Sequence, residues 1–154
     1  MKYFMKALPL LLLTIFGCSS VEKINLPTRG DITFVSEGDG TTKVKSIAAA
    51  ESYDAAVKEA EVYVIEQLFF RGLASSQQRM PMLSTNESGE KTKNKLYFDE
   101  LFGKNRYKSF VTESKTIGSV KYGQGVQVEM LVTVDHRSLR RDLENSGIIR
   151  KLGY

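Results

Sequence analysis

Apolar and polar residues alternate in two regions of the chain, and each region predicts a pair of antiparallel strands. In the first, residues 32–37 alternate before the turn Gly38-Asp39-Gly40, and residues 43–50 return as the partner strand. The alanines at 48–50 also fit the start of a helix, which leaves an alternative for the end of this strand.

The second region carries the clearer pattern. Residues 110–117 and 126–134 alternate on either side of a turn at Gly123-Gln124-Gly125. Five apolar side chains of the last strand share one face and predict that this face is buried: Val126, Val128, Met130, Val132 and Val134.

Helical spacing separates the two strand pairs. Ser52 is placed to cap a helix that Gly72 ends, with apolar residues at intervals of three and four between them. Ala56 and Ala60 are small enough to let this helix lie close on a sheet. Its outer face is expected to carry Lys58, Glu59, Glu61 and Glu66.

A second helix is predicted after the last strand. Asp135 is placed to cap it, Leu139 and Leu143 point inward, and Gly147 ends it. The isoleucine pair after Gly147 is expected to fold back against the final turn.

Residues 74–95 are polar and predict a loop, which is longer than compact domains usually hold without a role, so it is either mobile or a contact surface. Residues 96–102 resume apolar spacing before Gly103 and predict a short helix on the core. The aromatic residues around this helix are expected to pack in the core rather than stack on nucleic-acid bases: Tyr97, Phe98, Phe102, Tyr107 and Phe110.

Phe69 and Phe70 are adjacent and are not expected to face one core together, so one of them is a candidate exposed docking residue.

Hairpins separated by helices predict an α+β fold. We expect an antiparallel sheet of about four strands, in two hairpins, with two main helices packed on one face.

The first residues have the pattern of a secretion signal. Lys2 and Lys6 precede a nearly unbroken apolar stretch over residues 7–16. Crossing a bilayer takes about 20 apolar residues, so this stretch is too short for a transmembrane helix. Residues 1–17 are therefore expected to be a removable leader.

The only cysteine of the chain follows this leader directly. Ile15, Phe16, Gly17 and Cys18 resemble the lipobox of bacterial lipoproteins, which implies acylation of Cys18. Two or three acyl chains, at about 0.8 kcal/mol per buried methylene, would hold the protein at a membrane. The alternative is a secreted protein in which Cys18 is a free thiol. Either way, a single cysteine excludes an intrachain disulfide.

These features predict three segments: a lipoprotein signal peptide at residues 1–17, a lipid-anchored tether at residues 18–30, and a single α+β domain at residues 31–154. Ser19 stands where an Asp would signal retention in the inner membrane, so we expect the protein to be located in the cell envelope, on the outer membrane facing the periplasm.

Residues 1–17 contain two lysines and no acid, so their removal lowers the formal net charge from +4 to +2. That charge is too small for a nucleic-acid-binding protein, and no nucleic-acid partner is expected.

No catalytic or cofactor motif is visible. His136 is the only histidine, stands at the start of a helix and is expected to face solvent. No serine lies in a nucleophile elbow, and both Gly-rich stretches fit hairpin turns better than phosphate loops, so we expect no catalytic residue, metal or cofactor.

Arg137, Arg140 and Arg141 are candidates for contact with an anionic ligand such as a lipid phosphate. The competing interpretation is a solvated helix face on which acids and bases pair with one another.

Three segments carry a resemblance: "LFFRG", "YFDELFGKNRYKSFV" and the closing "LRRDLENSGIIRKLGY". From about Asp31 onward the chain resembles uncharacterised lipoproteins of Bacteroides-type bacteria, a resemblance that implies no activity. The helix followed by the strands "FVTESKT" and "VQVEMLVTV" is more loosely similar to small α+β domains of flagellar-assembly and related envelope lipoproteins. Shared architecture does not transfer a function or a catalytic residue.

The sequence therefore predicts a non-enzymatic, lipid-anchored envelope protein that binds or scaffolds another envelope component. One alternative is a module that binds a lipid or glycan through the long loop and the arginines, which requires an apolar pocket of roughly a few hundred Å³ near that loop. A hydrolase is a further alternative, and it requires polar side chains that converge in a cleft. The oligomeric state is left open.

Overall fold

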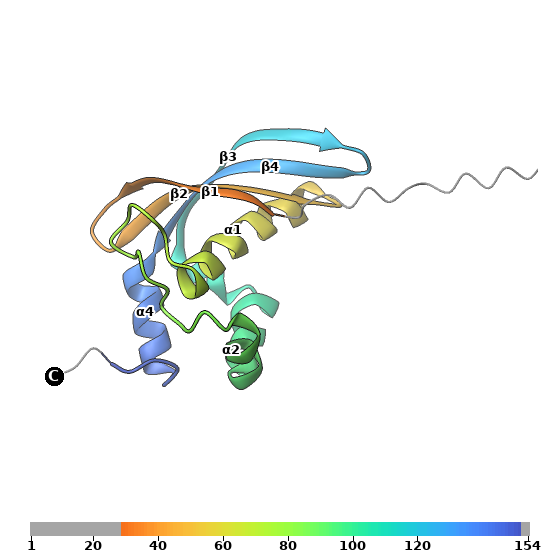
Figure 1. The fold of residues 1–154 in the computed structure, drawn as a ribbon. Helices are drawn as coiled ribbons and strands as arrows, with labels where there is room; N and C mark the ends of the chain where they lie inside the picture. The colour runs from red at the N-terminus through yellow and green to blue at the C-terminus, as the bar shows by residue number, and fades with distance from the viewer. Residues whose placement is uncertain (1–28, 152–154) are drawn as a thin grey trace, which may run out of the picture.

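The computed structural model describes residues 29–151, which form a layered α+β domain (Figure 1). The elements in chain order are β1 (Arg29–Glu37), β2 (Thr41–Ala50), α1 (Tyr53–Phe70), α2 (Glu87–Lys93), α3 (Lys95–Phe98), the π-helical turn η1 (Asp99–Gly103), the 3-10 turn η2 (Arg106–Phe110), β3 (Val111–Tyr122), β4 (Gly125–Asp135) and α4 (His136–Asn145). The predicted leader, Cys18 and the tether up to residue 28 lie outside the described residues. In residues 29–151 no helix is both long and apolar enough to span a membrane.

The four strands form one antiparallel sheet in the order β1-β2-β4-β3, which confirms the predicted fold class and both hairpins. The hairpins meet along β2 and β4, where Val44 lies opposite Val132 and Ala50 lies opposite Val126. The residues at 48–50 therefore continue the strand rather than start a helix. Strand β1 begins two residues before the expected start of the domain, so Arg29 and Gly30 belong to the sheet.

Helix α1 lies across one face of the sheet, beneath β2 and β4 in the view of Figure 1. Ser52 caps it as predicted, because the Ser52 hydroxyl accepts a hydrogen bond from the backbone N–H of Ala55. Ala56 and Ala60 are fully buried, and Ser46 of β2 donates a hydrogen bond to the Ala60 carbonyl at 3.1 Å. The small side chains thus bring the helix backbone into direct contact with the sheet.

The other side of α1 is covered as well, and this corrects three predictions. Glu61 and Glu66 are buried rather than solvent-facing, and Phe69 and Phe70 are both buried, so neither is an exposed docking residue. The segment from α2 to η2 packs on α1 as a third layer (Figure 1), and the ring of Phe98 contacts both Phe69 and Phe70. A helix that lies between two layers is covered on two sides, so adjacent residues can both be buried in the one core.

Part of the predicted loop at residues 74–95 is helical, because α2 forms within it. The chain before α2 packs against the end of α1: Met82 and Leu83 donate backbone hydrogen bonds to the carbonyls of Leu68 and Phe69. Gly72 makes this approach possible, since it has φ +71 and a Cβ there would lie 2.1 Å from the Arg79 carbonyl oxygen. This segment therefore packs directly on the end of α1.

The other helices predicted in the C-terminal half are confirmed. The short helix before Gly103 is α3 with η1, and the aromatic residues around it are at least half-buried. Asp135 caps α4 through the backbone N–H of Ser138, and Leu139 and Leu143 are fully buried. Gly147 has φ +70, and Ile148 donates its backbone N–H to Leu143 at 3.0 Å as the chain folds back.

Candidate functional site

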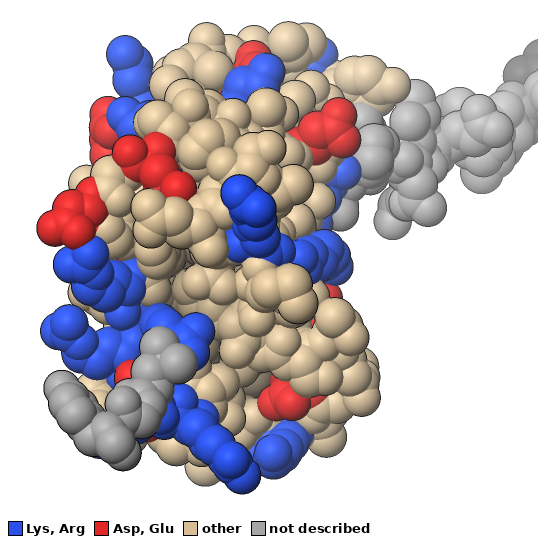
Figure 2. Space-filling model, turned by 60° about the vertical axis from the view of Figure 1, so that its left-hand side comes forward, with Lys and Arg blue, Asp and Glu red and all other residues tan. Residues whose placement is uncertain are grey.

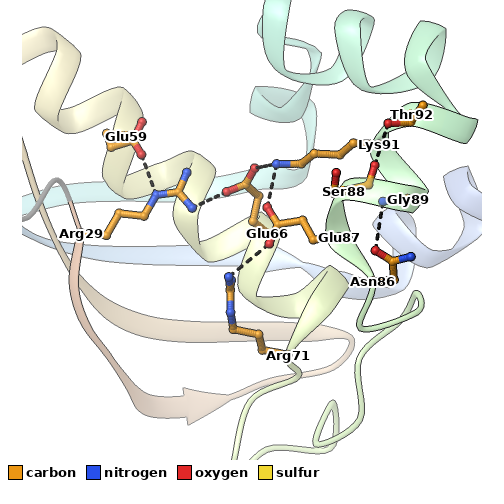
Figure 3. A network of polar contacts seen from close by, with 10 residues as sticks. All are labelled: Arg29, Glu59, Glu66, Arg71, Asn86, Glu87, Ser88, Gly89, Lys91 and Thr92. Atoms are coloured by element: carbon orange, nitrogen blue, oxygen red, sulfur yellow. Dashed lines mark hydrogen bonds and ion pairs between the residues drawn. The ribbon is translucent and has the colours of Figure 1, made fainter.

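A chain of alternating charges connects the first residue of β1 to α1 and α2 (Figure 3). Glu66 of α1 is at its centre, with a side chain only 4% exposed. Its Oε2 forms an ion pair with Nη1 of Arg29 at 2.5 Å, and its Oε1 accepts a hydrogen bond from Nζ of Lys91 at 2.5 Å. Glu59 contacts the other side of Arg29 at 2.6 Å, and Glu87 contacts Lys91 at 2.8 Å.

Arg71 completes this ion-pair chain with a 3.1 Å contact to Glu87. Three carboxylates and three cations alternate, so their formal charges cancel, and each carboxylate has at least one cationic partner. A buried charge is tolerated only when it is paired in this way.

The electrostatics at Lys91 and Glu87 favour the charged forms of these two groups. Burial acts to lower the pKa of Lys91, but the carboxylates of Glu66 and Glu87 outweigh it and raise that pKa. Burial likewise opposes ionisation of Glu87, and its hydrogen bond from Lys91 nonetheless lowers its pKa. The Lys91 ammonium also lies 5.7 Å from the ring centre of Phe70 and 5.8 Å from that of Phe102. The ion pairs of Arg29 with Glu59 and Glu66 attach the start of β1 to α1.

A second polar cluster joins α4 to the third layer. Asp142 of α4 accepts the Tyr97 hydroxyl at 2.7 Å and Nη1 of Arg106 at 2.9 Å. The guanidinium of Arg106 lies 5.0 Å from the centre of the Tyr97 ring. Burial and the adjacent Asp142 raise the pKa of the Tyr97 hydroxyl, so it remains protonated and acts as a donor. This cluster holds α4 in place.

The candidate anion-binding arginines of α4 face different surroundings. Arg137 forms an ion pair with Asp39 in the β1–β2 turn, and its backbone N–H bonds to the carbonyl of Gly40. Arg140 pairs with Glu144 one turn along the helix at 3.3 Å. Arg141 is exposed, and no ion pair within residues 29–151 includes it.

Figure 2 shows Lys and Arg side chains gathered over the lower part of the side of the molecule on which α4 lies, with a few acidic side chains among them. The geometry therefore gives each arginine its own position and builds no shared cradle around one anion. Pairing of Arg137 and Arg140 with acids agrees with the interpretation of a solvated helix face.

His136 is half-buried, which corrects the prediction that it faces solvent. Its Nδ1 lies 2.9 Å from the hydroxyl of Thr42, which is itself 1% exposed. Burial lowers the pKa of His136, partly opposed by Glu37 and Asp135. Thr42 belongs to β2, so the hydrogen-bond partner of His136 lies 94 positions away along the chain.

Cavities and metal sites in the described part of the chain are small or absent. A hollow of about 190 Å³ lies between the β1–β2 hairpin and α1, next to the segment that the sequence predicted as a loop. Ile32, Thr42, Val44, Val64, Gln67, Leu68 and Leu73 line it. The 190 Å³ includes space that is open to solvent, and the hollow encloses no room for even one water molecule. Pockets that enclose a drug-sized ligand are typically about 300–1,000 Å³, so this hollow is not a pocket of the kind that the lipid- or glycan-binding alternative requires. In residues 29–151 no group of three or more His, Cys, Asp and Glu side chains is arranged to hold a metal ion.

The helices leave the sheet face opposite α1, the open face, uncovered (Figure 1). Charged side chains pair across it: Lys43 of β2 contacts Glu113 of β3 at 2.7 Å, and Lys45 contacts Glu129 of β4 at 2.9 Å. Ile117 and Val120 of β3 are 45% and 61% exposed. No single residue in the sequence marked this surface, although the polar half of the strand alternation predicted that one face would be uncovered.

The chain matches no protein-family model, no curated protein and no solved structure. The interpretation of these surfaces therefore rests on the geometry of this chain alone.

Proposed function

We propose that this protein is a lipid-anchored, non-enzymatic component of a bacterial cell envelope, on the outer membrane facing the periplasm, whose domain binds another envelope protein. The observation that carries the proposal is Cys18 behind a leader with two lysines and an apolar stretch. Acyl chains on Cys18 would give durable attachment to lipid.

The ion-pair chain supports this proposal mechanically. Eleven positions separate Cys18 from Arg29, so the anchor and the domain can be at most about 40 Å apart along a fully extended chain. Arg29 is held by Glu59 and by the buried Glu66. Tension on an anchored N-terminal segment would therefore reach α1 through two ion pairs as well as through the edge strand β1.

The open face supports the binding part of the proposal. It combines charged pairs with exposed aliphatic side chains. A non-obligate interface taken as a whole is about as apolar as the rest of a protein surface, so this mixture is compatible with a binding surface. A binding role also needs no convergent catalytic group, and each carboxylate of the ion-pair chain already has a cationic partner.

The anchor is tested by intact-mass and peptide analysis of the mature N-terminus from the membrane fraction. We expect the chain to begin at Cys18 with the mass of two or three acyl chains, and Cys18→Ser to leave the membrane fraction. A mature chain with a free Cys18 thiol, or one that retains residues 1–17, would contradict the proposal.

The binding role is tested by photocrosslinking in cells. A crosslinking residue at Leu131, on the open face, should give one discrete adduct with an envelope protein. The same residue at Leu96, which is 83% exposed on α3, serves as the control and should not give that adduct. Identical products at both positions, or none at Leu131, would argue against the open face as a binding surface.

A further inference from the structure

Strand β3 presents the longest free backbone edge in the described part of the chain. It spans 12 residues and pairs only with β4, so its other edge is open to solvent. Most of its side chains are exposed. Such an edge pairs readily with another strand unless something prevents it.

The sequence of this edge is chemically symmetric about Ser114. Residues 111–117 read Val-Thr-Glu-Ser-Lys-Thr-Ile, so positions at equal distance from Ser114 carry like or complementary side chains. If two copies lie antiparallel with a two-fold axis at Ser114, Glu113 of each copy faces Lys115 of the other. Both Glu-Lys pairs form at once, because a two-fold interface repeats every contact.

The side chains of Glu113 and Lys115 lie on the same face of the sheet, as the proposed pairing requires. Glu113 lies opposite Thr133 of β4 and Lys115 lies opposite Leu131, which places both side chains on the open face. Residues directly opposite each other in an antiparallel pair share a face, so the carboxylate and the ammonium of two copies would meet there.

The side chains of Glu113 and Lys115 can each form a further ion pair. Oε2 of Glu113 contacts Lys43 at 2.7 Å and the Thr133 hydroxyl at 3.3 Å, whereas Oε1 takes part in none of these contacts, and the side chain is 52% exposed. Lys115 is exposed and forms no ion pair within residues 29–151. The Lys115 ammonium acts on the Glu113 carboxylate of its own chain without forming an ion pair with it, so both groups can take a direct partner from a second copy.

There is room for a second strand at the axis. Ser114 lies opposite Val132, whose side chain is fully buried on the helix-covered face, and yet Ser114 itself is exposed. The helical layer therefore does not cover β3 at this point. Irregular pairing on both sides, between Val111 and Glu113 and between Thr116 and Gly118, confines the regular stretch to four residues.

We propose that two copies of this protein pair through their β3 edges, antiparallel and with the two-fold axis at Ser114, into one sheet that continues across both copies. The partner is a second copy because the edge is complementary to itself. The short regular stretch implies a small interface and a weak, reversible dimer. This inference does not depend on the lipid anchor.

Cysteine crosslinking in the full chain tests the position of the axis. Ser114→Cys brings two thiols face to face, so we expect a disulfide or short bismaleimide dimer. Ser119→Cys, exposed on the same strand, is the matched control, because two copies of residue 119 would lie about 33 Å apart, ten strand positions. The wild-type chain reports any link through Cys18. Equal crosslinking at both positions, or none at residue 114, would overturn the proposal.

Charge reversal tests the complementarity. In the Ser114→Cys background, Glu113→Lys or Lys115→Glu alone places like charges opposite each other twice and should lower the dimer yield about tenfold. Mixing the two variants, with different tags, should restore the yield as a heterodimer only. Circular dichroism verifies that each variant folds. If mixing does not restore crosslinking between folded variants, the proposed register is wrong.

Discussion

Arg29, the first residue of β1, and Glu66, a buried residue in the last part of α1, form a 2.5 Å ion pair. The Arg29 guanidinium also lies 4.9 Å from the centre of the Tyr63 ring, so α1 holds it on two sides. Because Glu66 in turn binds Lys91 of α2, the start of the domain, the central helix and the third layer are joined through one carboxylate.

Replacing Glu66 with Gln should destabilise the domain more than any other single change in the ion-pair chain. The substitution leaves Arg29 and Lys91 without their shared counter-ion, and we expect the free energy of unfolding to fall by about 1–3 kcal/mol, because both cations are about one-third exposed. Urea denaturation measures the change. Glu59→Gln removes only the 32%-exposed partner of Arg29 and should cost less than about 1 kcal/mol. Equal losses in the free energy of unfolding for the two variants would show that Glu66 contributes no more to stability than Glu59 does.

Tyr107→Phe should destabilise the domain, because the buried carboxylate of Glu61 loses its hydrogen-bond donor. The Tyr107 hydroxyl donates to Oε2 of Glu61 at 3.0 Å, and both residues are buried. We expect thermal and urea unfolding to report a loss of about 1–3 kcal/mol. In the control, Tyr97→Phe, Asp142 keeps its ion pair with Arg106, so the loss should stay below about 1 kcal/mol. A smaller effect at Tyr107 than at Tyr97 would contradict this interpretation.

His136 should make the domain less stable in mild acid. Its pKa in the folded state lies below the ordinary value of 6.5, mainly because of burial, so the unfolded chain takes up the proton first. The stabilisation is therefore present above about pH 6.5 and is lost as the pH falls toward the folded-state pKa. NMR titration of the only histidine gives that pKa directly, and His136→Gln should flatten the pH dependence of unfolding between about pH 7 and 5. A midpoint at or above 6.5 would refute the assignment.

Gly72→Ala should disrupt the end of α1. Gly72 has φ +71, and an added Cβ would lie 2.1 Å from the backbone carbonyl oxygen of Arg79, which cannot move away as a flexible side chain could. We expect a loss of about 2–4 kcal/mol in the free energy of unfolding. Gly103→Ala is the matched control, because an added Cβ meets nothing within 4 Å there, and it should change stability by about 0.5 kcal/mol or less. Similar losses for both variants would mean that the approach of Arg79 is not what requires a glycine.

Local physics made several features predictable from the chain. Asp135 caps α4 through an atom only three residues away, and Gly147 adopts the left-handed conformation that ends it. The alternation in β4 predicted which side chains would be buried, because successive residues of a strand face opposite sides. The α+β class followed from the order of these elements. Acylation of Cys18 and the binding role remain predictions that the described residues do not test.

Only the tertiary structure decided which side chains of α1 meet solvent. A pattern of helical spacing implies one covered side, but the segment from α2 to η2 covers the opposite side, so Glu61, Glu66 and Phe70 are buried. The partners Tyr107 and Lys91 are 46 and 25 positions away, and a local pattern contains no information about contacts at that separation. The sequence by itself therefore determined the elements and their caps, because those depend on neighbours along the chain. The third layer, the ion-pair chain and the setting of His136 depend on which elements pack together, and folding alone decides that.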